Sequence, residues 1–206
     1  MARPAYSRDK REEIEAEICR AELVLFGTEG YRNVSLRRIA QSLNWSATAL
    51  YRYYDSKDTL LAAIRADGFV ILRQRLSEAR QTAETPFDMA ALAIKTYLAF
   101  AQAQPELYRL MYELDQTELT ANLQVLKNRR LAFAEAESIA TDILAVQGRD
   151  GDPNRMAHLF WIGAHGLAAL SVAHQLDLGQ SHDAMVEPLI HTLLGGLAAP
   201  YGEPSS

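Results

Sequence analysis

Residues that start helices recur along the whole chain, each in front of apolar residues spaced three and four apart. Ser35, Ser46, Ser56, Thr85 and Asp152 each precede such a segment, and these residue types accept hydrogen bonds from the first free N–H groups of a helix. Proline directly follows Thr85 and Asp152, at the first helical position, where its missing N–H costs nothing. No alternating pattern typical of a strand competes with this spacing. The sequence therefore predicts an all-α protein.

The same pattern predicts about nine helices. The first places Ile14, Ile18, Ala21 and Leu25 on one face, and the second and third are short. Pro188 either kinks the last helix or marks its true start. The expected helices run from about residue 7 to between 27 and 30, then over 35–43, 46–54, 56–82 and 85–104, from 105 onward, and over 117–147, 153–177 and 181–198.

Composition excludes several classes of protein. Of 206 residues, 49% are hydrophobic and 23% charged, which is ordinary for a globular chain and unlike disordered or collagen-like sequences. The longest apolar stretch, residues 159–173, is interrupted by His165 and Ser171 and is shorter than the ~20 residues that a bilayer requires. The charged first residues have no apolar run behind them, so we expect a cytoplasmic protein without a secretory signal or membrane segment. A single cysteine, Cys19, leaves no disulfide framework and no cysteine-based metal site.

The net charge of −5 conceals a local asymmetry. Residues 30–57 carry five arginine or lysine residues against Asp55 alone, whereas residues 58–206 carry 11 against 18 acidic residues. A small basic patch on an acidic body is typical of a segment that binds an anion such as nucleic acid. Many solvated faces are also basic, so the charge alone does not decide the function.

Residues 35–54 have the plan of a helix-turn-helix, in which one short helix supports a second that enters the major groove of DNA. If Leu50 and Tyr54 point inward, helical geometry places Ala47, Thr48, Tyr51 and Arg52 on the outer side. There, an arginine can donate to guanine or phosphate, and a threonine methyl can contact thymine. The alternative is that the tyrosines are half-buried packing residues, because helix-turn-helix shapes occur in many helical bundles.

The residues Phe26, Gly30-Tyr31, Val34-Ser35 and Ile39-Ala40, followed by Leu50-Tyr51-Arg52-Tyr53-Tyr54 and Ser56-Lys57-Asp58, resemble the TetR family of transcriptional regulators over about residues 8–65. The resemblance implies a helix-turn-helix DNA-binding domain over residues 1–56 and a ligand-binding and dimerisation domain over residues 57–206. Two departures lie in the turn, where Asn44 replaces the usual glycine and Trp45 a small aliphatic residue. Asparagine tolerates a left-handed backbone, so we expect the turn to survive. The DNA-binding residues expected from geometry and resemblance together are Ser35, Arg37, Ser46, Ala47, Thr48, Ala49, Tyr51, Arg52, Tyr53 and Lys57.

The rest of the chain resembles the family in outline. Trp161, His165 and Gly166, with residues 108–111 upstream, are similar to the subgroup named for a Trp-His-Gly motif. The resemblance implies a repressor that binds a pseudo-palindromic double-stranded DNA operator as a homodimer through its last two helices and is released by a small-molecule effector. The leucines of those helices serve equally well as internal core. Aromatic residues at helical spacing line the expected effector cavity or form an ordinary core: Tyr97, Phe100, Tyr108, Met111, Tyr112, Phe133, Trp161 and His165.

Two other classes of function were weighed. The enzyme motifs GxxxxGKS or GxxxxGKT, GxGxxG and HExxH are absent from the sequence, so we expect no enzyme. His158 and His165 share a helix face, but no third ligand lies near them in sequence, so we expect no metal and no cofactor. A helical ligand carrier is the remaining rival. Neither rival explains the outward face of residues 47–53, and a salt-sensitive complex with DNA would separate them.

Overall fold

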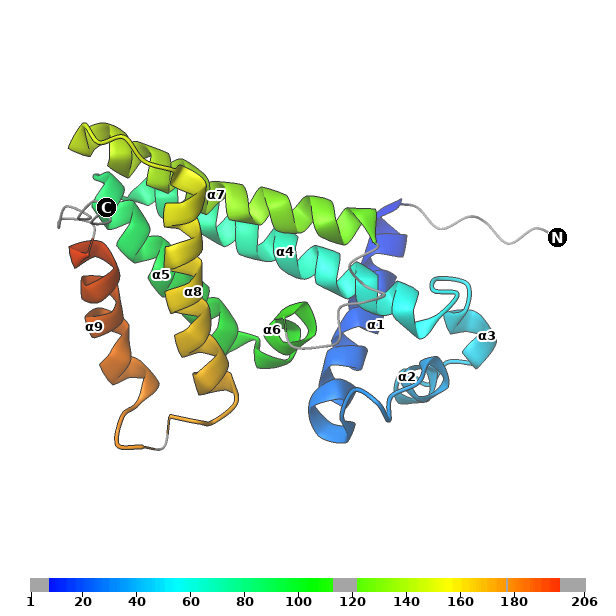
Figure 1. The fold of residues 1–206 in the computed structure, drawn as a ribbon. Helices are drawn as coiled ribbons and strands as arrows, with labels where there is room; N and C mark the ends of the chain where they lie inside the picture. Colours follow the sequence, from blue (N-terminus) through cyan, green and yellow to red (C-terminus); the bar gives the residue numbers. More distant parts are fainter. Residues whose placement is uncertain (1–7, 113–121, 177, 197–206) are drawn as a thin grey trace, which may run out of the picture. The chain divides into compact units, whose positions relative to one another are not determined.

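The computed structural model describes residues 8–112, 122–176 and 178–196. Within these residues the chain forms nine helices and no strand, which confirms the predicted all-α class (Figure 1). The helices are α1 Arg8–Glu29, α2 Leu36–Ser42, α3 Ala47–Leu50, α4 Lys57–Thr82, α5 Pro86–Ala103, α6 Pro105–Tyr112, α7 Leu123–Gln147, α8 Pro153–Val172 and α9 His182–Gly195.

Side-chain caps fix where the helices begin, because each satisfies an N–H group that has no partner within the helix. The side chains of Ser35, Ser46, Ser56, Thr85 and Asp152 accept hydrogen bonds of 3.0–3.2 Å from backbone N–H groups two or three residues later. All five predicted caps are therefore confirmed. Helix α6 begins at Pro105, also as predicted.

Two predicted helix ends differ from the structure. The third helix was expected to include Tyr54, but α3 ends at Leu50 and a turn follows. The eighth was expected to reach residue 177, but α8 ends at Val172 because His174 adopts a left-handed conformation with φ +54. That conformation usually ends a helix at glycine. Here, the N–H of Gln175 instead completes the cap on a carbonyl five residues earlier, at 2.8 Å.

Three further predictions concern the last helices. Pro188 lies inside α9 and does not start it. The expected start of the seventh helix at residue 117 and the expected end of the ninth at residue 198 lie outside the described residues. The described part of α7 begins at Leu123, where the Asn122 side chain accepts from the N–H groups of Gln124 and Val125 at 3.0 and 3.2 Å.

The chain divides into two compact units. The N-terminal unit comprises residues 1–67 and 106–125, and the C-terminal unit comprises residues 68–105 and 126–206. Helices α4 and α7 supply residues to both units, and nearly all of α6 belongs to the N-terminal unit. The functional boundary that we predicted after residue 56 stays a prediction.

The N-terminal unit is built around the apolar faces of α1–α4. Ile18, Ile39, Leu50 and Leu60 are all fully buried, and α2 packs against both α1 and α3. This arrangement confirms the predicted inward direction of Leu50. The C-terminal end of α1 lies close to α6, since a Cβ added at Gly27 would stand 3.2 Å from the side chain of Glu106.

In the C-terminal unit, α8 packs against α5 and α9 (Figure 1). Its core contains Ala90, Ile139, Ile143 and Phe160, which draw apolar residues from four helices together. A Cβ added at Gly163 would stand 2.8 Å from Leu193, so this glycine lets α8 and α9 approach closely. None of the described helices is both long and apolar enough to cross a membrane.

Candidate nucleic-acid interface and ligand cavity

The turn between α2 and α3 depends on a left-handed residue. Asn44 has φ +56, the conformation expected for an asparagine in the place of glycine. Its N–H donates to the Gln41 carbonyl at 3.1 Å, and the N–H of Trp45 donates to the Ala40 carbonyl at 2.8 Å. These bonds satisfy the last carbonyls of α2 and turn the chain sharply into α3.

The turn also positions Trp45. Its indole is half-buried, and its ring centroid lies 6.2 Å from that of Tyr53. The pair packs the start of α3 against the turn that follows it. Tyr53 is consequently half-buried, whereas Tyr51 is 51% exposed.

The outward side of α3 and its following turn carries the predicted contact residues. Thr48, Tyr51 and Arg52 are exposed, while Leu50 and Tyr54 are buried beneath them. Although α3 ends at Leu50, the N–H of Tyr54 still donates to the Leu50 carbonyl at 3.2 Å, which keeps the two inward residues in register. The remaining members of the predicted set are exposed at Ser35, Arg37 and Ser46 and half-buried at Ala47 and Ala49.

Neighbouring arginines on α2 have different surroundings. Arg37 is exposed, but Arg38 grips the carboxylate of Glu29 through Nε at 2.9 Å and Nη2 at 2.5 Å. Such a two-pronged pair is geometrically specific, so it ties α2 to the end of α1. Arg37 is therefore the arginine of this helix that faces outward, as we predicted.

Lys57 is held within the N-terminal unit. Its ammonium donates to the Tyr31 carbonyl and lies 4.0 Å from the centroid of the Tyr31 ring. Burial lowers the pKa of Lys57, and the charge of Glu22 opposes that shift. The side chain that we predicted to contact DNA thus rests against its own unit in this structure.

Glu22 is a residue that the sequence analysis missed. Its side chain is fully buried, and neither carboxylate oxygen accepts a hydrogen bond. Burial raises the pKa of Glu22 to about 7, although the positive charge of Lys57 acts in the opposite direction. A signal was available, because residue 22 falls at helical spacing between the buried positions Ile18 and Leu25.

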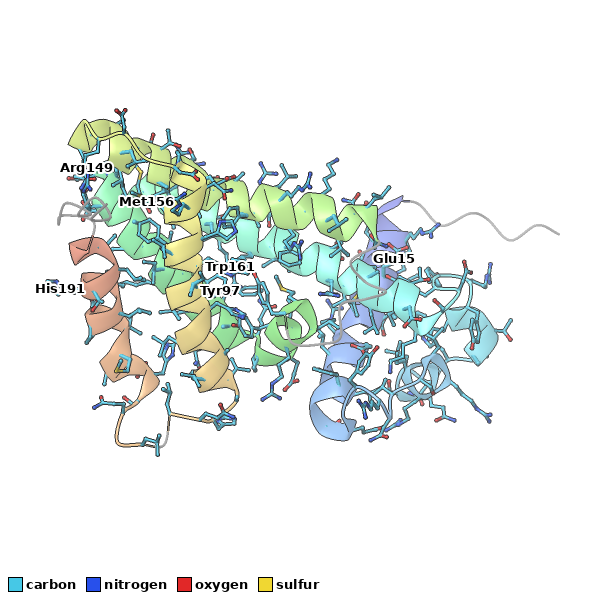
Figure 2. The ribbon with its side chains drawn as sticks, in the orientation of Figure 1. Glu15, Tyr97, Arg149, Met156, Trp161 and His191 are labelled. Atoms are coloured by element: carbon cyan, nitrogen blue, oxygen red, sulfur yellow. The ribbon has the colours of Figure 1, made fainter. Side chains whose placement is uncertain are left out.

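The eight predicted ligand residues divide into three groups. Tyr97, Phe133, Trp161 and His165 come together in the C-terminal unit, where Figure 2 shows Tyr97 and Trp161 directed toward one another from α5 and α8. Phe100 is fully buried, with its ring centroid 5.5 Å from the guanidinium of Arg75. The last group lies on α6, in the N-terminal unit, and consists of Tyr108, Met111 and Tyr112.

A short polar chain connects α5 to α8. The Tyr97 hydroxyl lies 3.0 Å from Nδ1 of His165, and the indole N–H of Trp161 donates to the same hydroxyl at 3.4 Å. Burial lowers the pKa of His165, which favours the neutral ring. His158, one turn before Trp161, has Nδ1 at 2.8 Å from the Asn154 carbonyl. Within the described residues, no three His, Cys, Asp or Glu side chains are grouped as a metal site would require.

An apolar cavity of about 50 Å³ lies beside this chain. Trp161 is the member of the predicted ligand set that lines it. Side chains from α4, α5, α7 and α8 complete the wall, and they are Leu76, Ala90, Ala93, Ile94, Ala136, Ile139, Phe160 and Ala164. Such a cavity suits a small uncharged group, because burying a charge without a partner is costly.

Two family models match the chain. Residues 18–64 match the model described as bacterial regulatory proteins, tetR family. Residues 89–193 match the model described as tetracyclin repressor-like, C-terminal domain. The first covers the turn and capped helices described above, and the second covers most of α5 to α9.

Curated relatives agree with these matches. HTH-type transcriptional regulators of Mycobacterium tuberculosis and Mycobacterium bovis are each 33% identical to this chain over 110 residues. That alignment covers 51% of this chain and 46% of each relative, so the chain spans about half the length of the curated relatives it matches.

Solved structures share the fold over most of the chain. A protein of unknown function from Rhodococcus sp. RHA1 is 26% identical, with a TM-score of 0.76 over 88% of this chain and 93% of its own. A TetR/AcrR-family transcriptional regulator from Thermobifida fusca is 21% identical, with a TM-score of 0.70 over 89% and 98%. A fatty acid degradation regulator from Bacillus halodurans is 15% identical, with a TM-score of 0.75 over 94% and 98%. The last two likenesses concern the fold alone.

Proposed function

The chain belongs to the TetR family of bacterial regulatory proteins, and from this premise we propose that it is a transcriptional repressor that a small-molecule effector releases from DNA. The observation that carries the proposal is the exposed face of α3 and its turn, where Thr48, Tyr51 and Arg52 stand above the buried Leu50 and Tyr54. No packing role within the N-terminal unit accounts for these outward side chains. They have the chemistry that reads and grips a DNA groove.

Each side chain has a distinct role in this proposal. Arg37 and Arg52 contact bases, because a guanidinium matches the paired acceptors of guanine. Tyr51, Tyr53 and Lys57 bind phosphates and set the register of the protein on the duplex. The smaller members of the set lie at helix starts or on the close-approach side, where N–H groups favour phosphate, and they are Ser35, Ser46, Ala47, Thr48 and Ala49.

We further propose that the protein acts as a homodimer through α8 and α9. Leu159, Ile162 and Leu170 are 40%, 62% and 44% exposed and recur on one face of α8. Gly166 lies on the same face, and a Cβ added there would meet no atom within 4 Å. A second copy would cover this apolar stripe, and two recognition helices would then read a two-fold-symmetric site.

The effector belongs in the C-terminal unit under this proposal. The 50 Å³ cavity is lined by apolar side chains and by Trp161, whose N–H is already bonded to Tyr97. A ligand there must favour one conformation of the protein over another, since an effector shifts an equilibrium only by its difference in affinity. Helix α4 is suited to carry that change, because it contributes to both units and begins at Lys57. The Trp-His-Gly subgroup stays a prediction.

The rival functions are a ligand carrier and an enzyme. A regulator of bacterial transcription acts in the cytoplasm, where its operator lies, and we expect no catalytic activity. Fluorescence anisotropy of duplex DNA, titrated with the full chain from 50 to 200 mM salt, tests the proposal. Neutralised phosphates should make the affinity fall linearly with salt on logarithmic axes. A flat response, or no binding at 50 mM salt, would favour the rivals.

A further inference from the structure

The N-terminal unit buries a carboxylate where an apolar side chain would pack. Glu22 is 0% exposed, on the face of α1 that also buries Ile18 and Leu25. Neither of its oxygens accepts a hydrogen bond. A buried carboxyl group without donors is destabilising when it is charged, so it takes up a proton more readily than an exposed one.

The charged and titratable groups near α1 are few. From α4, the ammonium of Lys57 acts on Glu22. From α2, Arg38 is occupied by Glu29, which lies farther along α1. From α6, Glu106 approaches α1 at Gly27, and on α1 itself the thiol of Cys19 senses the charges of Glu22, Glu15 and Asp67. Lys57 is therefore the cation to which the charge of Glu22 is coupled.

Lys57 is also poised between two positions. Its ammonium donates to the Tyr31 carbonyl and lies against the Tyr31 ring, at the start of a helix that follows the recognition turn. Burial disfavours the charged form of this amine, whereas the negative charge of Glu22 favours it. Removing that negative charge would leave the cation better solvated, or better paired with phosphate, outside the unit.

We propose that Glu22 is a positioning residue for Lys57. The ionised carboxylate holds the ammonium against Tyr31, and protonation of Glu22 releases it to a DNA phosphate. The inference rests on the proposed DNA-binding function and adds to it a dependence on pH. Operator affinity should rise as the pH falls through neutrality, because a neutral Glu22 neither retains Lys57 nor repels phosphate.

The sequence limits other sources of such a dependence. All five histidines lie at residue 158 or beyond, in the C-terminal unit. The N-terminal α-amino group ordinarily titrates between about pH 7 and 8, so the test needs a variant in which Glu22 alone cannot titrate. Glu22→Gln keeps the shape and removes the charge. Glu17→Gln is the matched control, because Glu17 is an exposed acid on the same helix.

The experiment measures the affinity of the full chain for duplex DNA by fluorescence anisotropy at pH 6 and pH 8, over a range of salt concentrations. For the unmodified chain and Glu17→Gln, affinity should be on the order of threefold to fivefold higher at pH 6. Each N-terminal unit should also release about 0.9 more counterions there, seen as a steeper logarithmic salt slope. Glu22→Gln should show the steeper slope at both pH values, and Lys57→Met the shallower slope at both.

A change in protein stability alone would not alter the salt slope, so this readout separates positioning from a structural role. If Glu22→Gln retains the pH dependence of the unmodified chain, or if the slope of every variant is independent of pH, the inference is overturned. If no variant binds DNA with a salt-dependent affinity, the proposed function itself fails. That failure is distinct, because NMR titration of the Glu22 side chain, with the Lys57 ammonium followed in parallel, would still measure their coupling in the free protein.

Discussion

Replacing Glu22 by glutamine should stabilise the protein at high pH. In the folded chain the pKa of this carboxyl group is about 7, against an ordinary value of 4.5. The shift corresponds to about 3 kcal/mol at pH 8, since each pKa unit is worth about 1.4 kcal/mol. Glutamine removes the charge but still buries a polar amide, so we expect Glu22→Gln to raise the free energy of unfolding by about 2–3 kcal/mol.

The sign follows from proton binding. Between pH 4.5 and 7 the folded chain retains the Glu22 proton while the unfolded chain has released it, so stability falls as the pH rises. Above pH 7 the loss is complete, and below pH 4.5 both states are protonated and the loss disappears. The advantage of the variant should therefore be full at pH 8 and close to zero at pH 4.

The two tryptophans allow the measurement to be made on the right unit. Trp45 lies in the N-terminal unit and Trp161 in the C-terminal unit. In a Trp161→Phe background, urea unfolding followed by fluorescence reports on Trp45 alone. Glu17→Gln is the control and should stay within about 0.5 kcal/mol of the parent at every pH. Parallel stability curves for Glu22→Gln and the parent between pH 4 and 8 would refute the reasoning.

Three further variants test other parts of the account. Arg52→Ala should cost about 1–3 kcal/mol of operator binding and relax specificity at one position, and equal losses on operator and random DNA would remove Arg52 from the base-reading set. Ile162→Arg places a charge within the exposed α8 stripe and should yield monomers in sedimentation at micromolar concentration, whereas an unchanged dimer would move the interface elsewhere. Ser46→Ala removes the cap of α3 and should lower the urea-unfolding free energy of the N-terminal unit by about 0.5–2 kcal/mol, a cost that an unchanged transition would disprove.

The parts of the fold that depend on neighbouring residues were predictable from the sequence. A cap such as Ser35 or Thr85 satisfies N–H groups within its own first turn, so the pattern and the structure agree. Asn44 adopts the left-handed conformation that its place in the turn required. The end of α8 was missed because His174 takes a conformation that usually marks glycine, and no local pattern distinguishes it.

The candidate sites were less predictable, because they depend on packing between distant segments. Tyr97 and Trp161 share a hydrogen bond, yet Tyr108 belongs to the other compact unit, and their spacing in sequence did not separate them. The outward direction of Thr48 and Arg52 could be predicted, since it follows from the burial of Leu50 on a short helix. The contacts these residues make with DNA stay predictions.

The central claim is that the outward face of α3 and its turn reads DNA as one half of a symmetric pair. Selection of binding sites from a pool of random duplex DNA, with the full chain as bait, tests it most directly. The account predicts enrichment of a pseudo-palindrome whose half-sites are centred about one helical turn, or a multiple of it, apart. Its enrichment should weaken at matched positions of both half-sites in Arg52→Ala. A pool that stays random, or an enriched site unaffected by changes at Arg37, Thr48, Tyr51 and Arg52, would contradict the account.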